Sequence, residues 1–458
     1  MSSEEFLIKA KNSFKKNLLQ ESKNYLNKIL LLEKERNIEA LNLMGIILGR
    51  ENNLIGARNF FDKAFKIDPN NHLLYFNLAR ILSDYNFDLE ALNYYSRAIE
   101  IFPDFKEAYN NKGNSLQKLG NFLEAIDCYD NANKIDPDYS DAVYNKSFCQ
   151  LILGDFKNGL KSYEARWTRK RTTKYPYSQI SRLNNLSELK NKSLIVFSEQ
   201  GLGDCIQFSR YIFKLLDWGA EKVIFEVNKK LKNLISYQFR KSKKIDVVEF
   251  GENFVLTDFQ IPLLSLPLLF GTTVKTVPFA ERYFNISAQK IINLNDKIKL
   301  NNNKLNVAIA CSGYQKFDNY HKKQIKLKYF LPLLNYCNLF LVQNSVDEED
   351  QLCLKENPEI IFIGKEIVDF EDIGALIENM DLVISVDTVF AHLAGALEKR
   401  TFLILSEYSD WRWLLDTKNS IWYNSLILFR KKKEENNWKK IFKEIVNLLI
   451  FTKKLNIN

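Results

Sequence analysis

The sequence predicts an all-helical repeat array followed by an α/β region whose two halves each carry a parallel sheet. A 34-residue period runs through the first third of the 458 residues. After residue 193, short apolar runs typical of strands alternate with helix-like stretches, and a polar segment at 285–304 divides them into two series. A chain of this length exceeds what one hydrophobic core usually serves, so at least two domains are expected.

Four series of residues define the period. Small residues fit where two helix backbones approach closely, an aromatic residue fills the space between neighbouring pairs of helices, and a proline follows the second helix of each pair. At least three such units are needed to bury a continuous core. The series are Gly45, Ala79, Gly113 and Ser147; Ala57, Ala91 and Ala125; Phe61, Tyr95, Tyr129 and Tyr163; and Pro69, Pro103 and Pro137.

This pattern resembles the tetratricopeptide repeat family, an all-α solenoid. The resemblance covers three full repeats within 39–138 and a fourth that ends near Trp167, where Gly159 replaces the usual alanine and no closing proline follows. A degenerate helical pair at 3–37 caps the array, which therefore occupies residues 1–167. Such arrays usually offer a concave groove to a protein partner.

Asn77, Asn111 and Asn145 also share one register of the period. The resemblance places this position on the concave face, where each amide could bond a peptide backbone with one donor and one acceptor. An alternative interpretation is compositional, since the chain is rich in asparagine and the residue is common at this position of the repeat.

Residues 168–192 have the composition of a solvated linker, with a basic run at 168–174 followed by Pro176. The first α/β half is expected at 193–290. Its predicted strands are 194–198, 222–227, 245–250 and 259–264, and a helix is expected from the glycine-rich turn to about 217.

The second α/β half is expected at 305–458, after the polar segment. Two consecutive doubly wound halves imply a cleft between them. Its predicted strands are 305–311, 339–343, 360–363, 381–386 and 401–405, and an amphipathic helix is predicted at 437–451.

The first strand of the first half leads into a turn that contains Gly201, Gly203 and Asp204. Two glycines permit a tight turn and the close approach of a ligand. The turn could be a truncated dinucleotide fingerprint with Glu226 as the ribose ligand, but Ile206 stands at the third glycine position. Asp204 would stay ionised near the helix N-terminus and repel phosphate, so a base fits better than an anion site. A helix cap explains the position equally well.

In the second half, Asp387 and Thr388 end a strand and open a helix. Backbone N–H groups at such a turn suit a phosphate. His392 lies four residues after Thr388, on the same helix face, and could donate to a phosphate oxygen. Alternatively, His392 is a satisfied structural residue and Asp387 is only an N-cap.

Two further segments carry candidate ligands. Ser312 and Gly313 follow the first strand of the second half, and Lys323 lies in the loop beyond them with His321 and Lys322. A hydroxyl, a backbone N–H and an ammonium group could hold a diphosphate, although a solvated loop also explains the lysines. At 410–413, two tryptophans flank an arginine, a pattern that favours packing between the halves over stacking on a base.

Composition excludes several classes of protein. The net charge of +9 is mild and selects no anionic partner by itself. Six scattered cysteines without a CxxC pair indicate reduced thiols, and three histidines give little material for a catalytic metal site. Without an apolar stretch that could span a bilayer or a secretory signal at the start, we expect a cytoplasmic protein, with peripheral attachment to the inner membrane face left open.

Four motifs together resemble bacterial proteins in which tetratricopeptide repeats precede a glycosyltransferase family 9, heptosyltransferase-like domain. They are the segments at 199–208, 262–271, 386–395 and 410–413. The resemblance implies a GT-B fold, two Rossmann-like halves around a cleft, and metal-independent, inverting transfer from a nucleotide sugar without a further cofactor.

The same resemblance assigns roles to single residues. Asp204 would be the base, whereas Asp387, Thr388 and His392 would contact the donor, with Ser312, Gly313 and Lys323 at the diphosphate. The sequence departs from the family at Cys311, where tryptophan is usual, and at 321–324, 398–401 and 409.

These assignments predict a glycosyltransferase that moves a hexosyl or heptosyl unit to a hydroxyl of a saccharide, a lipid-linked or a protein acceptor, with repeats that recruit the acceptor or a partner protein. No nucleic-acid motif accompanies the basic residues, so a nucleic-acid partner is not expected. Two alternatives stay open: a repeat scaffold with a relic or sensor GT-B domain, and a protein O-glycosyltransferase similar in layout to O-GlcNAc transferases, whose catalytic motifs do not match these loops.

Overall fold

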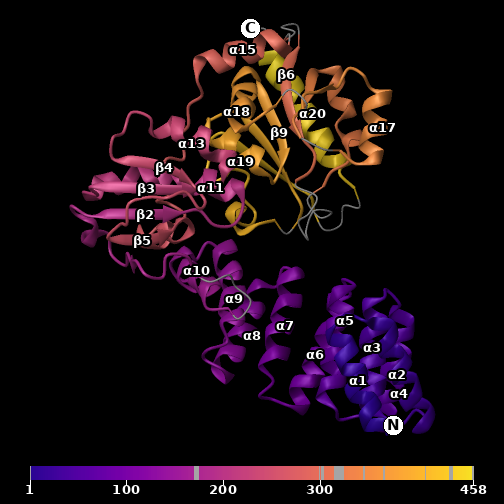
Figure 1. Cartoon of the computed structure of the whole chain (residues 1–458). Coiled ribbons are helices and arrows are strands. Elements are labelled where there is room, and N and C mark those ends of the chain that lie inside the picture. The colour runs from indigo at the N-terminus through magenta and orange to yellow at the C-terminus, as the bar shows by residue number, and fades with distance from the viewer. Residues whose placement is uncertain are drawn as a thin grey trace. The chain divides into compact units, whose positions relative to one another are not determined.

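The computed structural model describes residues 2–169, 175–298, 300, 304–313, 324–343, 346–364, 367–407, 409–432 and 437–455 (Figure 1). Contacts divide the chain into two compact units. One comprises residues 1–150 and 161–173, and the other comprises residues 151–160 and 174–458. Within the described ranges, every helix is too short or too polar to cross a membrane.

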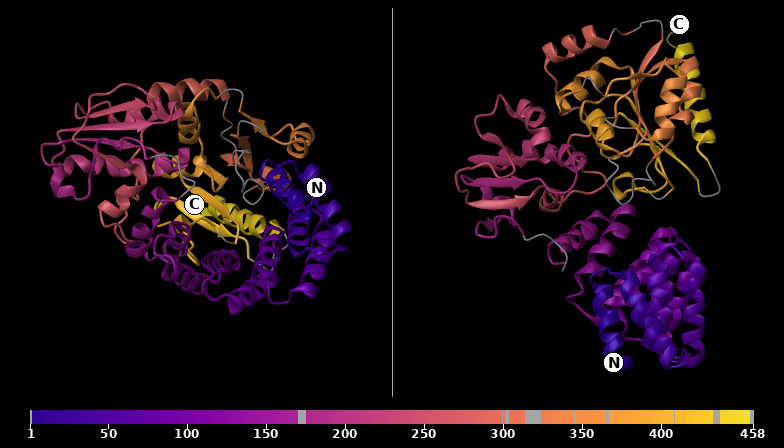
Figure 2. Two further views of the ribbon diagram at one scale, coloured as in Figure 1. Left: turned by 60° about the horizontal axis from the view of Figure 1, so that its bottom comes forward. Right: turned by 45° about the vertical axis from the view of Figure 1, so that its right-hand side comes forward.

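The N-terminal region is a succession of helical pairs joined by short turns, which Figure 2 shows from two further sides. Helix α2 follows α1 in the position expected for the capping pair. The α-helices are α1 (Ser3–Lys15), α2 (Leu19–Leu32), α3 (Ile38–Arg50), α4 (Leu54–Ile67), α5 (His72–Asp84), α6 (Asp88–Ile101), α7 (Lys106–Lys118), α8 (Phe122–Ile135), α9 (Ser140–Ile152) and α10 (Phe156–Tyr163), and η1 (Glu164–Trp167) follows.

The periodic residues form the core of these pairs. Phe61 and Tyr129 are fully buried. A methyl group added to Gly45 would lie 2.7 Å from the Phe61 ring, and one added to Gly113 would lie 2.7 Å from the Tyr129 ring. Phe61 and Tyr129 therefore pack on the small residue of their own pair, whereas the sequence predicted a position between neighbouring pairs. The period itself is confirmed as a packing pattern.

The first sheet has five parallel strands in the order β1-β5-β2-β3-β4. Three of its strands begin or end within one residue of the predicted positions, whereas β5 ends two residues early because the chain turns into a short helix at Leu263. The strands are β1 (Ser181–Arg182), β2 (Ser193–Phe197), β3 (Lys222–Val227), β4 (Ile245–Glu249) and β5 (Phe259–Pro262).

The segment expected to be a solvated linker contributes to this sheet. Its strand β1 pairs with β5, and Ile180, Leu183 and Leu189 are buried. The helix expected after the glycine turn is also interrupted. It runs as α11 (Leu202–Phe208), η3 (Ser209–Tyr211), α12 (Ile212–Leu215) and η4 (Leu216–Trp218), and α13 (Lys232–Phe239) and α14 (Leu266–Leu269) complete the half.

The second sheet has six parallel strands in the order β11-β10-β9-β6-β7-β8. The edge strand β11 was not predicted from the sequence. The elements are β6 (Leu305–Ala310), β7 (Cys337–Leu341), α17 (Glu348–Glu356), β8 (Ile361–Phe362), α18 (Phe370–Asn379), β9 (Leu382–Val386), α19 (Val389–Ala396), β10 (Thr401–Leu405), β11 (Leu426–Arg430) and α20 (Lys439–Leu455).

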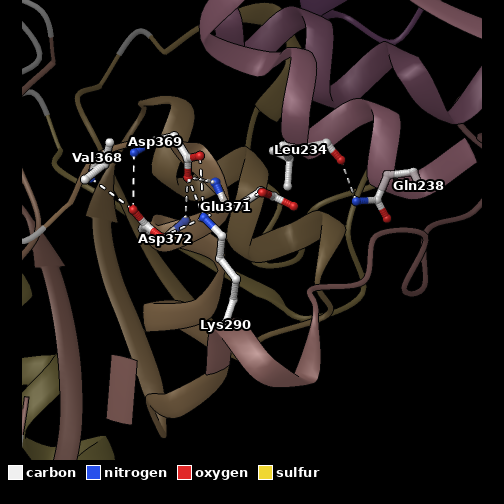
Figure 3. Close-up of polar contacts among 7 residues, drawn as sticks. All are labelled: Leu234, Gln238, Lys290, Val368, Asp369, Glu371 and Asp372. Carbon is white, nitrogen blue, oxygen red and sulfur yellow. Dashed lines mark hydrogen bonds and ion pairs between the residues drawn. The ribbon is translucent and has the colours of Figure 1, made fainter. Parts of the chain in front are cut away.

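The polar segment between the sheets contains a helix, α15 (Ala288–Ile298), where the sequence indicated only a linker. Lys290 projects from α15 toward the acidic start of α18 (Figure 3). Its ammonium lies 2.9 Å from a carboxylate oxygen of Asp372 and 3.4 Å from one of Asp369. Acidic groups suit a helix N-terminus, so the lysine and the helix dipole both hold these carboxylates. The segment is thereby attached to the second half.

Candidate functional site

The glycine turn follows β2 and opens α11, so it lies at the carboxyl edge of the first parallel sheet. Asp204 is the third residue of the helix, and its carboxylate accepts a 2.8 Å hydrogen bond from the N–H of Gly201. The interpretation of Asp204 as a helix cap is confirmed to this extent. The side chain is 17% exposed.

Arg412 is the main partner of Asp204, and it comes from the second half. Its guanidinium donates to Asp204 at 2.5 Å, to Asp410 at 2.7 Å and to Gln207 at 2.8 Å. Only 7% of the arginine side chain is exposed, and its guanidinium lies 4.6 Å from the centre of the Trp411 ring. The predicted packing role of the 410–413 segment is confirmed, but the sequence did not pair its arginine with Asp204.

Opposing effects act on the pKa of Asp204. Burial raises the pKa of the carboxyl above its ordinary value because the charged form loses water. The Arg412 guanidinium and the Gly201 N–H lower the pKa, and the charges of Asp410 and Asp387 raise it. Asp387 of the second half is therefore close enough to interact electrostatically with the carboxyl of the first half.

In the second half, β9 ends at Val386 and α19 begins after Thr388. Thr388 occupies the N-cap position, but its side chain does not cap the helix and instead lies 3.2 Å from the Ser385 hydroxyl. Asp387 precedes the N-cap, so its interpretation as the cap is wrong. Its side chain is 10% exposed.

His392 lies one turn inside α19 and is 5% exposed. Its Nδ1 lies 3.0 Å from the Tyr423 hydroxyl, and its ring stacks on Trp413 with 5.5 Å between ring centres. Nε2 lies 4.0 Å from Asp387 Oδ1, which is too far for a hydrogen bond. His392 is therefore a well-packed residue, as the structural alternative expected, with one ring nitrogen turned toward the acidic residue.

The two predicted motifs meet. A methyl group added to Gly203 would lie 2.7 Å from Cδ2 of His392, and one added to Gly313 would lie 3.8 Å from the methyl group of Thr388. Gly203 thus needs to be a glycine because a histidine from the other half occupies the space of its side chain. Asp204, Asp387, Thr388 and His392 lie around this contact.

The predicted diphosphate segment is described only in part. Ser312 and Gly313 follow β6, and Ser312 is 3% exposed. The backbone N–H of Cys311 donates to the Gln343 side chain at 3.0 Å, which fixes the start of the segment. Lys323, together with His321 and Lys322, lies outside the described residues.

The predicted asparagine register forms bonds within the array. Asn77 donates to Asn42 at 3.1 Å, and Asn145 donates to Asn110 at 3.0 Å. Asn110 in turn donates to Asn111 at 3.2 Å. These amides therefore connect successive repeats. A bound peptide could use only the amide donors and acceptors that these hydrogen bonds leave free.

Sequence reasoning missed three side chains that build the site. Arg412 binds Asp204, Gln207 accepts a hydrogen bond from Arg412, and Tyr423 lies within hydrogen-bond distance of the His392 ring. An arginine between two tryptophans, and a glutamine within an otherwise apolar stretch, are weak signals because neither indicates a partner. Among the described residues, no group of three or more His, Cys, Asp or Glu side chains is arranged to hold a metal ion.

Two segments match the family described as tetratricopeptide repeat, residues 38–71 and residues 107–139. The N-terminal region contains tetratricopeptide repeats. These repeats indicate interaction with proteins. No curated protein matches the sequence.

Solved structures similar to the chain cover about its N-terminal third. MamA (41-end) from Desulfovibrio magneticus RS-1 is 20% identical, with 35% of this chain and 91% of that chain covered and a TM-score of 0.32. The pilF protein of Pseudomonas aeruginosa is 13% identical, with coverages of 36% and 74% and a TM-score of 0.34. A tetratricopeptide repeat protein from Parabacteroides merdae ATCC 43184 is 20% identical, with coverages of 35% and 64% and a TM-score of 0.32.

Proposed function

We propose that the α/β region is a glycosyltransferase of the GT-B type, which moves a sugar from a nucleotide-sugar donor to an acceptor hydroxyl with inversion and without a metal. The observation that carries this proposal is the meeting of the glycine turn with the start of α19. Asp204 belongs to one parallel sheet and Asp387, Thr388 and His392 to the other, and Gly203 touches His392. Ligands of doubly wound folds bind outside the carboxyl ends of the strands, where these residues lie.

In the proposed reaction, the acceptor oxygen attacks the anomeric carbon while the bond from that carbon to the diphosphate breaks. Asp204 takes the proton of the hydroxyl, and the nucleoside diphosphate leaves with the bonding electrons. A base needs a free lone pair. The ionised carboxylate has about four acceptor positions, of which the recorded bonds to Gly201 and Arg412 use two, so a hydroxyl can still donate to it.

The charge of the leaving group would be met at the start of α19. Backbone N–H groups in the first turn of a helix carry partial positive charge and attract phosphate. The Thr388 side chain does not occupy them, because it contacts Ser385 instead. Ser312 and Gly313 approach the same turn through the contact of Gly313 with Thr388. Fixed donors at such a place stabilise developing negative charge without a metal ion.

Two tests address this function directly. A panel of nucleotide sugars should include one that raises the melting temperature of the full chain, and mass spectrometry should then find the sugar on an acceptor. Asp204→Asn should lower turnover by about 10²–10⁴-fold, since general-base catalysis contributes on that scale. Binding of the donor should survive in the variant. Unchanged turnover would remove Asp204 from the mechanism.

The ion pair between Arg412 and Asp204 favours a second candidate, a repeat scaffold whose α/β region has no catalytic activity. In this candidate, the carboxylate that the guanidinium and the backbone N–H hold has a purely structural role, which is to fix the glycine turn. This candidate predicts that no nucleotide or nucleotide sugar shifts the melting temperature.

If the acceptor is a protein brought by the repeats, glycan should be found on co-expressed proteins. A product confined to lipid or saccharide would exclude a protein acceptor.

A further inference from the structure

The amino edge of the first sheet forms one continuous surface. All five strands are parallel, so the segments that precede them meet at this edge. The N–H of Asn191 donates to the carbonyl of Gly219 at 2.9 Å, that of Glu221 donates to Lys192 at 2.9 Å, and that of Val223 donates to Lys244 at 2.8 Å. The loops before β2, β3 and β4 are therefore hydrogen-bonded side by side.

This edge is rich in cations. Lys192, Lys214 and Lys222 pair with the local carboxylates of Asp258, Asp217 and Asp246. A further five cations are exposed and have no carboxylate within salt-bridge distance in the described chain, whereas the acidic residues left without such a pair are Glu188 and Glu221. The five are Lys190, Arg240, Lys241, Lys243 and Lys244.

An aromatic side chain stands among these cations. Trp218 is 47% exposed, and it precedes Gly219, where an added methyl group would lie 3.5 Å from the Lys190 side chain. Tryptophan is enriched where proteins meet the headgroup layer of a membrane, because its ring is apolar and its N–H is polar. An exposed tryptophan beside lysines is unusual for a surface that meets only water.

We propose that this edge, called the basic edge and composed of Lys190, Trp218, Arg240, Lys241, Lys243 and Lys244, binds the surface of a membrane that contains anionic lipids. Clusters of four or more lysines and arginines are attracted to such surfaces. Lysines act as mobile point charges, which suits the diffuse charge of a lipid surface. Single-stranded nucleic acid would need several aromatic side chains in series for its bases, and this edge exposes one.

The basic edge and the candidate site lie at opposite edges of the same sheet. The basic edge precedes the strands, whereas the glycine turn follows β2. Attachment through the basic edge would therefore leave the glycine turn and Asp204 uncovered. The inference does not depend on the proposed transfer reaction, because it concerns only charge and exposure at the amino edge.

Each cation near an anionic surface changes the partition coefficient about fivefold, the equivalent of ~1 kcal/mol. The test is sedimentation of the full chain with vesicles of phosphatidylcholine, alone or mixed with phosphatidylglycerol. Lys243→Gln with Lys244→Gln should lower binding to the mixed vesicles about 25-fold. Added salt should also weaken the binding of the unaltered protein, because exposed charges are screened.

A matched control lies at the other edge of the same sheet. Lys229 and Lys230 follow β3, are exposed, and form an adjacent pair of the same charge. Lys229→Gln with Lys230→Gln should change vesicle binding less than about twofold. Both pairs are exposed, and circular dichroism checks that the two variants fold equally. Equal losses in both variants would overturn the assignment to the basic edge.

Two other outcomes would also overturn it. Binding to pure phosphatidylcholine as tight as to the mixed vesicles would remove the role of charge. Tight binding of single-stranded DNA or RNA that Lys243→Gln with Lys244→Gln abolishes, in a protein that ignores the vesicles, would make nucleic acid the partner. Trp218→Ser leaves the charge unchanged and should still reduce vesicle binding several-fold. An unchanged affinity would contradict insertion of the tryptophan ring into the headgroup layer.

Discussion

Replacing Arg412 by methionine should destabilise the α/β unit strongly. Arg412 is almost buried and donates to Asp204, Asp410 and Gln207. Methionine preserves most of the apolar contact with Trp411 but removes every donor. Asp204 would then keep one recorded partner, the N–H of Gly201, in a largely desolvated place.

The magnitude follows from the stranded charge. Removing one partner of a buried ion pair costs about 3–5 kcal/mol of unfolding free energy, because the other charge stays buried and uncompensated. Asp204 retains 17% exposure and one hydrogen bond, so we expect a loss near ~3 kcal/mol. Adding Asp204→Asn removes the stranded charge, and the double variant should lose at least ~1 kcal/mol less than the sum of the single losses.

The loss should also depend on pH. Burial raises the pKa of Asp204 above its ordinary value of 3.8, so the folded state binds this proton more readily than the unfolded state. Ionisation then lowers stability as pH rises through the interval between the two values. Without Arg412 the folded pKa rises further. The deficit of the variant should therefore be largest near neutral pH and shrink as pH falls toward the raised value.

The assay is urea unfolding followed by tryptophan fluorescence, because five of the six tryptophans lie in the unit that contains Asp204. The transition is recorded at neutral and mildly acidic pH for the two single variants and the double variant. Strict additivity of the two losses, or a deficit that grows as pH falls, would refute the claim that Arg412 compensates an ionised Asp204.

Three further outcomes are expected. Gly203→Ala should lower the free energy of unfolding by about 1–3 kcal/mol and weaken donor binding, because the added methyl group would lie 2.7 Å from His392. Unchanged donor affinity in calorimetry would contradict a donor site at this contact. Tyr129→Phe should lower the free energy of unfolding by about 1 kcal/mol in thermal unfolding, because the hydroxyl no longer donates to Asn114 or Gln117. An unchanged melting temperature would show that these hydrogen bonds do not contribute to stability. All six cysteines are buried, so Ellman's reagent should react only on unfolding, and rapid labelling of the folded chain would argue against this core.

Periodic and apolar patterns allowed much of the fold to be predicted. Phe61 and Tyr129 recur because each fills the same space in a repeating unit, and the strands of the α/β region appear as short apolar runs since both faces of a parallel sheet are buried. Strand β1 could not be predicted, because two residues carry no period. Helix α15 has a polar sequence and is held by the ion pairs of Lys290, which are tertiary contacts.

The candidate site was predictable by residue type but not by partnership. Glycines at a strand-to-helix turn indicated close approach, and Gly203 indeed touches His392. Nothing in the order of the residues indicates that Arg412, more than two hundred positions later, binds Asp204. Such pairs depend on how two sheets meet, which is decided by packing over both halves rather than by local sequence.

The proposed function requires that the contact between the glycine turn and α19 belongs to a nucleotide-sugar site. The most direct measurement is calorimetric titration of the nucleotide sugar that stabilises the chain into the unaltered protein and into His392→Ala. Lys243→Gln serves as the control, because Lys243 is exposed and precedes β4, at the opposite edge of the first sheet. We expect the affinity of His392→Ala to be lower by about tenfold or more, since loss of a hydrogen bond to a charged group costs about 1.5–3 kcal/mol, whereas the control should keep the affinity of the unaltered protein. Equal affinity in all three proteins would contradict the proposed function, as would the absence of binding by any nucleotide sugar.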